Sequence, residues 1–287
     1  MATAALVVMW LVFIRLRVGR EFENVVWEHR TVMAKRLRVR QDSLLRLVDE
    51  STIALGVVAV LVAGIARRRW LLGVVVAVAV AGATLTAQVL KRMVINRPPT
   101  PGELARISAN SFPSGHATIC TALGLALLVI LPRRWRRTAT VLVALWVVWQ
   151  SVGVLAAGWH RPSDALAGMS VAVAWMAAAV WVLARLGRVV RDDDDHLHVI
   201  SERRLVVGAL VVSLAALLVT AQLGGETIFS GGGVAYLASC AVIIVAGVGV
   251  VWWFWLMLSD WTLDVRPPPS PPVVAVLGVD GGPHPEA

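Results

Sequence analysis

The chain alternates between long apolar runs and short polar segments. The runs that could cross about 30 Å of hydrocarbon span residues 2–14, 52–66, 70–90, 116–131, 138–157, 165–186, 205–223 and 234–258. In lipid each run must satisfy its own backbone hydrogen bonds, and a segment of this length does so only as a helix. Their many valines therefore do not make them strands. The pattern predicts an all-α, polytopic membrane helical bundle, with 2–14 and 52–66 as its weakest spans.

Composition supports a membrane protein and argues against a nucleic-acid partner. Hydrophobic residues make up 58% of the 287 residues, charged residues 16%, and the mean hydropathy is +0.75. A net charge of +9 would suggest nucleic acid in a soluble chain, but here the arginines cluster between apolar runs. That placement encodes orientation in a bilayer. We therefore expect membrane lipids, and no nucleic acid, around this protein.

The arginine clusters predict a topology. They lie at 67–69, 133–137 and 185–204, in alternate loops that must share one face of the membrane. The positive-inside rule makes that face cytoplasmic. The segments 91–113 and 158–163 then share the outer face, which predicts a multi-pass protein of the cell membrane with an extracytoplasmic site.

Composition also divides the chain into five segments. Residues 1–50 are expected to form a short N-terminal membrane helix and a basic amphipathic segment, which lies along the interface or serves as a solvated arm. Residues 51–186 form the core, and 187–204 a charged cytoplasmic linker. Residues 205–259 predict a C-terminal helical hairpin that packs on the core or on another copy, which would give a homo-oligomer. The Pro/Gly-rich tail, 260–287, is expected to be disordered.

The stretch FPSGHAT, residues 112–118, begins one apolar run with polar residues. Pro113 blocks a helix from upstream, and Ser114 is a good N-cap. Gly115 lets the backbone approach a ligand closely, and the first-turn amides favour an anion, with His116 beside it. Alternatively, these residues simply start a helix and His116 is an interfacial histidine.

A second stretch, HRPSD at 160–164, strengthens the case for a site. His160 and Asp164 are four residues apart at the start of another run. A carboxylate that accepts a hydrogen bond from one imidazole nitrogen leaves the other nitrogen basic, as a nucleophilic histidine requires. The alternative, that Asp164 or Ser163 merely caps the helix, is compatible with this role.

Cations at the end of the run 70–90 complete the pattern. Lys91, Arg92 and Arg97 lie on the same predicted face as the two histidines. Charge-assisted donors of this kind bind a phosphate dianion and stabilise the additional charge of its transition state. Alone, they would be ordinary interfacial residues at a helix end.

We expect no cofactor and no metal at this site, because it gathers cations rather than carboxylates. The acidic run 191–198, RDDDDHLH, could bind a metal but is more typical of a solvated loop. Cys120 and Cys240 lie in separate apolar runs and are expected to pack as small residues rather than form a bridge.

Taken in chain order, the stretches 91–97, 112–118 and 160–164 resemble the three signature blocks of the type 2 phosphatidic acid phosphatase superfamily. This superfamily also includes vanadium haloperoxidases. The resemblance covers roughly residues 70–186. It implies a metal-independent phosphatase with six core helices and a site at the outer membrane face. In family terms, His160 attacks phosphorus to form a phosphohistidine, Asp164 orients it, and His116 protonates the leaving oxygen. The residues implied in holding the phosphate are Lys91, Arg97, Ser114 and the amide of Gly115.

The chain departs from the family pattern in two places. Five residues separate Lys91 from Arg97, where the family usually has six. Asn96 and Pro98 suggest that the helix has already ended, so the loop absorbs the difference, or Arg92 replaces Lys91.

The second departure is Val154, at the position where the third block normally carries an arginine. Arg161 or Arg106 could supply the missing phosphate-binding cation.

The leading hypothesis is hydrolysis of a lipid phosphate or diphosphate of the phosphatidate, phosphatidylglycerol phosphate or polyprenyl (di)phosphate type. Abundant Arg, Ala and Val suggest a GC-rich bacterial genome, which makes a cell-envelope carrier lipid attractive. The alternative is a catalytically weak lipid-phosphate-binding or scaffold membrane protein. Val154 favours that alternative, whereas the presence of both histidines and Asp164 opposes it. Vanadate-dependent halide oxidation is disfavoured by the membrane setting.

Overall fold

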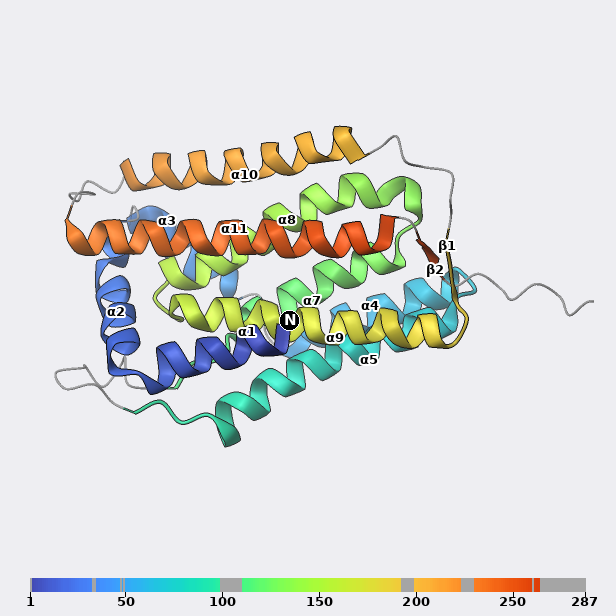
Figure 1. Cartoon of the computed structure of the whole chain (residues 1–287), viewed down its shortest axis with the longest axis horizontal. Coiled ribbons are helices and arrows are strands. Elements are labelled where there is room, and N and C mark those ends of the chain that lie inside the picture. The colour runs from blue at the N-terminus through green and yellow to red at the C-terminus, as the bar shows by residue number, and fades with distance from the viewer. Residues whose placement is uncertain are drawn as a thin grey trace, which may run out of the picture.

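The structure is a computed structural model, and it describes residues 2–32, 35–46, 48, 50–98, 110–191, 199–222, 230–259 and 261–263. These residues form an elongated bundle of helices (Figure 1). The elements are α1 (Ala2–Met9), η1 (Trp10–Arg15), α2 (Arg17–Glu28), η2 (His29–Val32), α3 (Lys35–Leu45), α4 (Glu50–Ala66), α5 (Trp70–Val89), η3 (Leu90–Val94), α7 (Gly115–Ile130), α8 (Arg133–Ala156), α9 (Pro162–Arg185), β1 (Val189–Arg191), α10 (Val199–Gln222), α11 (Gly231–Ser259) and β2 (Trp261–Leu263).

Over its described part, each apolar run predicted from the sequence coincides with one helix or with two consecutive helices, to within one residue at its C-terminal end. Four described helical segments are long and apolar enough to cross a membrane: Trp70–Val94, α8, α9 and α11. The pair Ala2–Arg15 and Arg17–Val32, bent by 84°, would count as a fifth. The apolar parts of α4, α7 and α10 are shorter. The prediction of an all-α polytopic bundle is confirmed, and β1 and β2 add only one short antiparallel pair.

Close packing of α7 against α9 aligns the first turns of these two helices. Gly168 of α9 lies so near α7 that a Cβ atom there would be 2.7 Å from the backbone oxygen of Ser114 and 3.0 Å from the amide nitrogen of Thr118. Only glycine permits this approach. As a consequence, the segment that carries His116 and the segment that carries His160 lie side by side.

The bundle has two chemically different ends. At one end, arginine side chains donate hydrogen bonds to backbone carbonyls at or after helix ends. Arg67 donates to the carbonyl of Ile130 at 2.5 Å, and Arg136 donates to the carbonyl of Trp261 at 2.9 Å. The antiparallel helices α8 and α9 have 24 residues each, so roughly 36 Å separates this end from the opposite one. There α2 crosses the bundle, far from β1 and β2 (Figure 1).

The N-terminal segment covers the end opposite the arginines. Helix α2 buries a stripe of Gly19, Glu23 and Val26 against the bundle. Val18 and Phe22, on a different side of the helix, are exposed. Burying a glutamate in such a stripe is costly unless it is paired. Its partners therefore matter for the site.

The two helices of the C-terminal hairpin contribute differently to the core. Helix α11 packs against α8 and α9 and buries much of its length, whereas α10 lies outside it against α8 and α11. Cys120 and Cys240 are buried free thiols. The predicted disordered tail lies outside the described residues from position 264 onward.

Candidate active site

The segment 112–118 builds a capped helix start. Ser114 has an extended backbone, and its side chain accepts a hydrogen bond from the amide of Ala117 at 3.3 Å. Thr118 Oγ1 donates back to the carbonyl of Ser114 at 2.7 Å. The predicted N-cap is confirmed. It leaves the positive end of α7, which starts at Gly115, directed at the end of the bundle.

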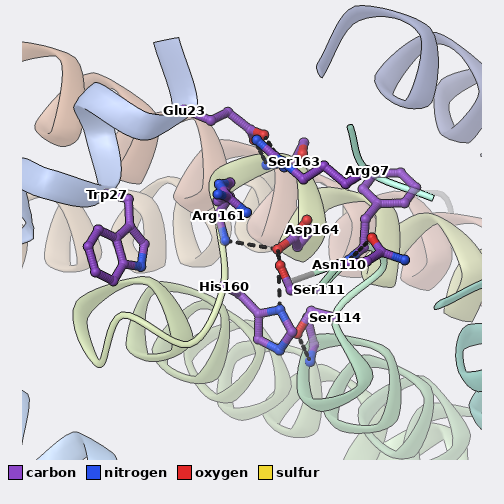
Figure 2. A network of polar contacts seen from close by, with 12 residues as sticks. Glu23, Trp27, Arg97, Asn110, Ser111, Ser114, His160, Arg161, Ser163 and Asp164 are labelled. Carbon is purple, nitrogen blue, oxygen red and sulfur yellow. Dashed lines mark hydrogen bonds and ion pairs between the residues drawn. The ribbon is translucent and has the colours of Figure 1, made fainter. Parts of the chain in front are cut away.

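His160 and Asp164 are in contact, as their spacing predicts. Asp164 is fully buried, and its Oδ2 accepts hydrogen bonds from His160 Nδ1 at 3.3 Å and from the amide of Arg161 at 3.0 Å. Ser111 Oγ donates to the same oxygen (Figure 2). The amide of Ser114 donates to the backbone oxygen of Asp164 at 2.9 Å, which ties α7 to α9. The carboxylate thus fixes the imidazole with Nε2 available.

His116 lies beside this pair. It is close enough to His160 and Lys91 for their charges to interact. Its Nε2 lies 3.3 Å from the carbonyl oxygen of Leu45, and because a carbonyl only accepts, that nitrogen carries a proton in this contact. Trp159 packs edge-on against the ring, with the two centroids 5.2 Å apart.

A side chain of α3 holds Trp159 in place. Its Nε1 donates to Asp42 Oδ1 at 2.7 Å, and Asp42 pairs with Arg46 at 2.9 Å. The hydrogen bond from Arg46 is the main cause that lowers the pKa of Asp42, so this carboxylate stays ionised. Sequence reasoning missed this support, because nothing in the pattern of 35–46 connects it to the histidines.

Lys91 lies where α5 changes its winding. The π-helical turn η3 ends at Val94, and Ile95 is extended. Asn110 donates to the backbone carbonyls of Lys91 and Ile95, at 2.7 and 2.5 Å. The expectation that the helix ends before Arg97 is therefore confirmed. Lys91 is partly buried and interacts electrostatically with Asp164, whereas Arg92 is exposed.

Residues 70–188 match the family model of the PAP2 superfamily. This part of the chain is similar to the PAP2 superfamily, and we refer to it as the PAP2 domain. The resemblance predicted from the sequence is thereby confirmed, and no curated protein or solved structure gives a significant match. Members of this superfamily are generally phosphatases, which supports hydrolysis of a phosphoric ester as the reaction class.

The PAP2 domain starts with α5 and ends just after α9, so α2 and α3 lie outside it. The side chains of Glu23, Asn24 and Asp42 nevertheless reach residues of the predicted site. Sequence reasoning missed all three. For Glu23 a signal existed, since it falls on the same helical stripe as Gly19 and Val26.

Arg97 of the PAP2 domain is paired with Glu23. Its Nη1 lies 3.1 Å from Glu23 Oε2, and the two side chains are 1% and 0% exposed. The other oxygen of Glu23 accepts a hydrogen bond from the amide of Ser163 at 2.9 Å. Figure 2 shows Glu23 and Arg97 on one side of Asp164 and the imidazole of His160 on the other. Arg97, which the sequence predicts to bind phosphate, therefore does not converge on His160.

Burial dominates the electrostatics of Glu23. It raises the pKa of this carboxyl to about 7, with a further increase from the charge of Asp164. The ion pair with Arg97 and the hydrogen bond from Ser163 act in the opposite direction.

Arg161 is also held by α2. Its side chain is buried, and Nη2 donates to Asn24 Oδ1 at 3.2 Å. Val154, at the position of the missing family arginine, is fully buried in the apolar core. Arg106, the other candidate replacement, lies in the range 99–109 outside the described residues.

In the described part of the chain, no group of three or more His, Cys, Asp or Glu side chains is placed to hold a metal ion. The acidic run at 192–198 is not among those residues. The groups that do converge are imidazoles, a lysine, a hydroxyl and a helix N-terminus, which suit an anion.

Proposed function

We propose that this protein is a membrane-embedded, metal-independent phosphatase that hydrolyses a lipid phosphate or diphosphate through a phosphohistidine intermediate. One observation carries the proposal: the buried Asp164 carboxylate accepts from His160 Nδ1, beside His116 and the N-terminus of α7. A protein that only binds phosphate needs cations but no such imidazole–carboxylate pair.

In the first step, His160 Nε2 attacks phosphorus and the bond from phosphorus to the lipid oxygen breaks. Asp164 stabilises the imidazolium character that develops, because its carboxylate accepts a hydrogen bond from Nδ1–H throughout. His116 gives a proton to the departing lipid oxygen. The leaving group is a lipid alcohol when the substrate is a monophosphate, and a lipid monophosphate when the substrate is a diphosphate. Lys91, Ser114 and the amide of Gly115 stabilise the equatorial oxygens.

In the second step, water attacks the phosphohistidine. His116, now neutral, takes a proton from the water, the nitrogen–phosphorus bond breaks, and inorganic phosphate leaves. His160 returns to its starting state, with its Nδ1–H still hydrogen-bonded to the Asp164 carboxylate. Both steps use positioned donors and need no metal.

The substrate class follows from the setting of the site. The histidines lie at the end of a bundle whose described part contains four helices long and apolar enough to cross a membrane. A lipid whose tail lies among the helices would present its phosphate at that level. Phosphatidate, phosphatidylglycerol phosphate and polyprenyl (di)phosphates all meet this requirement. We place this end on the extracytoplasmic face of the cell membrane, by the positive-inside rule.

The test is phosphate release by purified protein in detergent, with chelator present, from a panel of these lipids. His160→Ala and His116→Ala are compared with His29→Ala, a histidine on the neighbouring N-terminal segment. We expect the two site variants to lose roughly a thousandfold or more and His29→Ala to stay active. An acid-labile phosphoenzyme that is absent in His160→Ala would identify the intermediate.

Two outcomes would contradict the proposal. Activity that requires added divalent metal would refute the metal-independent mechanism. Folded protein that binds lipid phosphate but releases none would favour the alternative of a binding or scaffold protein, and Val154→Arg would then test whether the missing arginine explains the inactivity.

A further inference from the structure

A cavity of about 220 Å³ lies between α8 and α10, and α3 and α11 complete its walls. The lining residues of α8 follow one another at helical spacing and form a single stripe, roughly 16 Å long at the rise of an α-helix: Leu145, Val148, Trp149, Val152, Gly153 and Ala156. Compact small molecules usually occupy pockets of about 300–1,000 Å³. A smaller cavity along a stripe of this length suits one hydrocarbon chain better.

The cavity opens on the outside of the bundle. Trp149 of α8 and Val212 of α10 line it and are exposed, whereas Leu217 and Ile244 line it and are buried. Helix α10 lies at the edge of the bundle (Figure 1). If α8 and α10 lie in a membrane, as proposed, the surroundings of this opening are hydrocarbon chains of lipid.

Gln41 of α3 brings a polar group to this apolar space. It is 6% exposed, and its Nε2 has no hydrogen-bond partner among the residues that the structure describes. The amide lies directly over Gly153, where a Cβ atom would overlap Nε2. A buried N–H donor is destabilising until an acceptor reaches it. The carbonyl oxygen of an ester is the acceptor that an acyl lipid places at the start of its chain.

The polar groups of the lining are ordered along the bundle. Gln41 contacts Gly153, near the end of α8 that leads to the histidines, and the exposed Arg40 precedes it on α3. The lining of α8 continues from there to Leu145, near the middle of the helix. A charge, then a hydrogen-bond donor, then apolar walls match the phosphate, the ester and the chain of a membrane phospholipid.

We propose that this cavity binds one acyl chain of an anionic, ester-linked membrane phospholipid, whose ester carbonyl accepts from Gln41 Nε2 and whose phosphate lies at Arg40. The proposal depends on the membrane setting of the proposed function but not on hydrolysis. Neither His116 nor His160 is part of the lining. Three of the four helices that form the walls lie outside the PAP2 domain, so this is a second lipid site in addition to that of the substrate.

The bound lipid would pack against the helix that supports the phosphatase site. Helix α3 follows Gln41 with Asp42, which accepts from Trp159, and with Leu45, whose carbonyl contacts His116. The second lipid would therefore help to hold α3 in place.

The first test counts bound lipid by native mass spectrometry during titration with phosphatidylglycerol. This lipid is a phosphodiester and lacks the terminal phosphate that the proposed reaction removes. Ala216→Trp fills the cavity, and Ala215→Trp is the matched control, because Ala216 lines the cavity whereas its exposed neighbour Ala215 does not. We expect Ala216→Trp to bind the first lipid roughly tenfold more weakly than the wild type, because of the steric clash, and Ala215→Trp to match the wild type. Equal binding by the two variants would refute the site.

The second test needs only the wild type. Phosphatidylglycerol is compared with its ether-linked analogue, which has the same chains and headgroup but no ester carbonyl. We expect the ester to bind roughly three- to tenfold more tightly, the effect of one hydrogen bond, and Gln41→Leu to bind both lipids equally. A wild type without this preference would overturn the assignment of the ester to Gln41, whatever the variants do.

The third test concerns the headgroup. Phosphatidylcholine with the same chains should bind roughly fivefold more weakly than phosphatidylglycerol, because Arg40 attracts an anionic headgroup. The difference should disappear in Arg40→Gln and remain in Arg17→Gln, an exposed arginine of α2. A preference that survives in Arg40→Gln would contradict this part of the proposal.

A competition experiment separates this site from that of the substrate. Inorganic phosphate should leave the binding of phosphatidylglycerol unchanged relative to chloride at the same ionic strength. Displacement of the lipid by phosphate alone would place it in the substrate site, and the proposal would be wrong. Because lipid binding is measured without turnover, failure of the proposed hydrolysis is distinguishable from failure of this inference.

Discussion

Asp164 organises the site at the scale of single residues. One of its oxygens accepts from His160, from the amide of Arg161 and from Ser111, while its backbone oxygen accepts from the amide of Ser114. The first two contacts follow from local spacing, since His160 and Arg161 precede Asp164 by four and three residues. The contacts with Ser111 and Ser114 join distant segments, and only the fold creates them.

Arg161 is the described candidate for the cation that is missing at Val154. Its guanidinium is buried and bonds Asn24. We expect Arg161→Ala to raise the KM for the lipid phosphate roughly tenfold, the usual effect of a lost charge-assisted hydrogen bond, whereas Arg17→Ala, on an exposed part of α2, should have no effect. Steady-state kinetics of both variants check this. Unchanged kinetics in Arg161→Ala would show that this arginine does not replace the family residue.

Glu23 gives the protein a predictable pH dependence of stability. Burial raises its pKa from 4.5 to about 7, so between these values the folded state holds a proton that the unfolded chain has released. Stability contributed by this group therefore falls as pH rises through that window. Arg97 and Asp164 are the charged groups that act on it most directly.

The measurement is the melting temperature in detergent from pH 5 to 7.5 for the wild type, Glu23→Gln and Glu21→Gln. We expect the melting temperature of the wild type to fall relative to that of Glu23→Gln as pH rises, because the glutamine cannot ionise. Glu21→Gln should run parallel to the wild type. Parallel curves for all three proteins would show that Glu23 does not titrate in this range.

At the scale of elements, the site depends on how closely α7 and α9 approach. Gly168 permits the contact, and the amide of Ser114 then reaches the backbone oxygen of Asp164. Both helices are apolar, so the sequence pattern predicts that they pack but not where along their lengths. Gly168 sets that register because its missing Cβ faces backbone atoms, which cannot move aside.

Gly168→Ala tests this dependence. The added Cβ would lie 2.7 Å from a backbone oxygen, so the helices must separate, at a cost of about 1–3 kcal/mol in stability. The histidines shift relative to each other, and we expect kcat to fall by roughly tenfold or more. Gly208→Ala on α10 is the matched control, because nothing lies within 4 Å of a Cβ there. If the two variants have the same stability and the same kcat, Gly168 does not set the spacing of α7 and α9.

At the scale of the whole molecule, the arginine clusters and the histidines lie at opposite ends of the bundle. The hydrogen bonds of Arg67 and Arg136 mark one end, and the contacts of α2 with the PAP2 domain mark the other. This separation is what the positive-inside rule requires if the site faces outward. The rule assigns the compartments, and labelling can test the assignment.

We expect a membrane-impermeant maleimide to label Arg17→Cys in intact cells and to label Arg134→Cys only after the membrane is opened. Both arginines are exposed, and the native Cys120 and Cys240 are buried, which keeps the background low. The reverse pattern would place the histidines on the cytoplasmic side.

The amino-acid sequence alone was enough to predict the class of fold, because long apolar runs in lipid can only be helices, whatever their neighbours are. It also determined the chemistry that depends on local spacing: the Ser114 cap, the His160–Asp164 pair and the helix end before Arg97. These features involve residues within one turn or one loop.

The folded structure sets what surrounds these features. It placed Glu23, Asn24 and Asp42, from helices before the PAP2 domain, against residues of the site, and it directed Arg97 toward α2 rather than toward His160. Such contacts join residues more than seventy positions apart. They depend on which helix crosses the end of the bundle and on the glycines that let helices approach, and a linear pattern records neither.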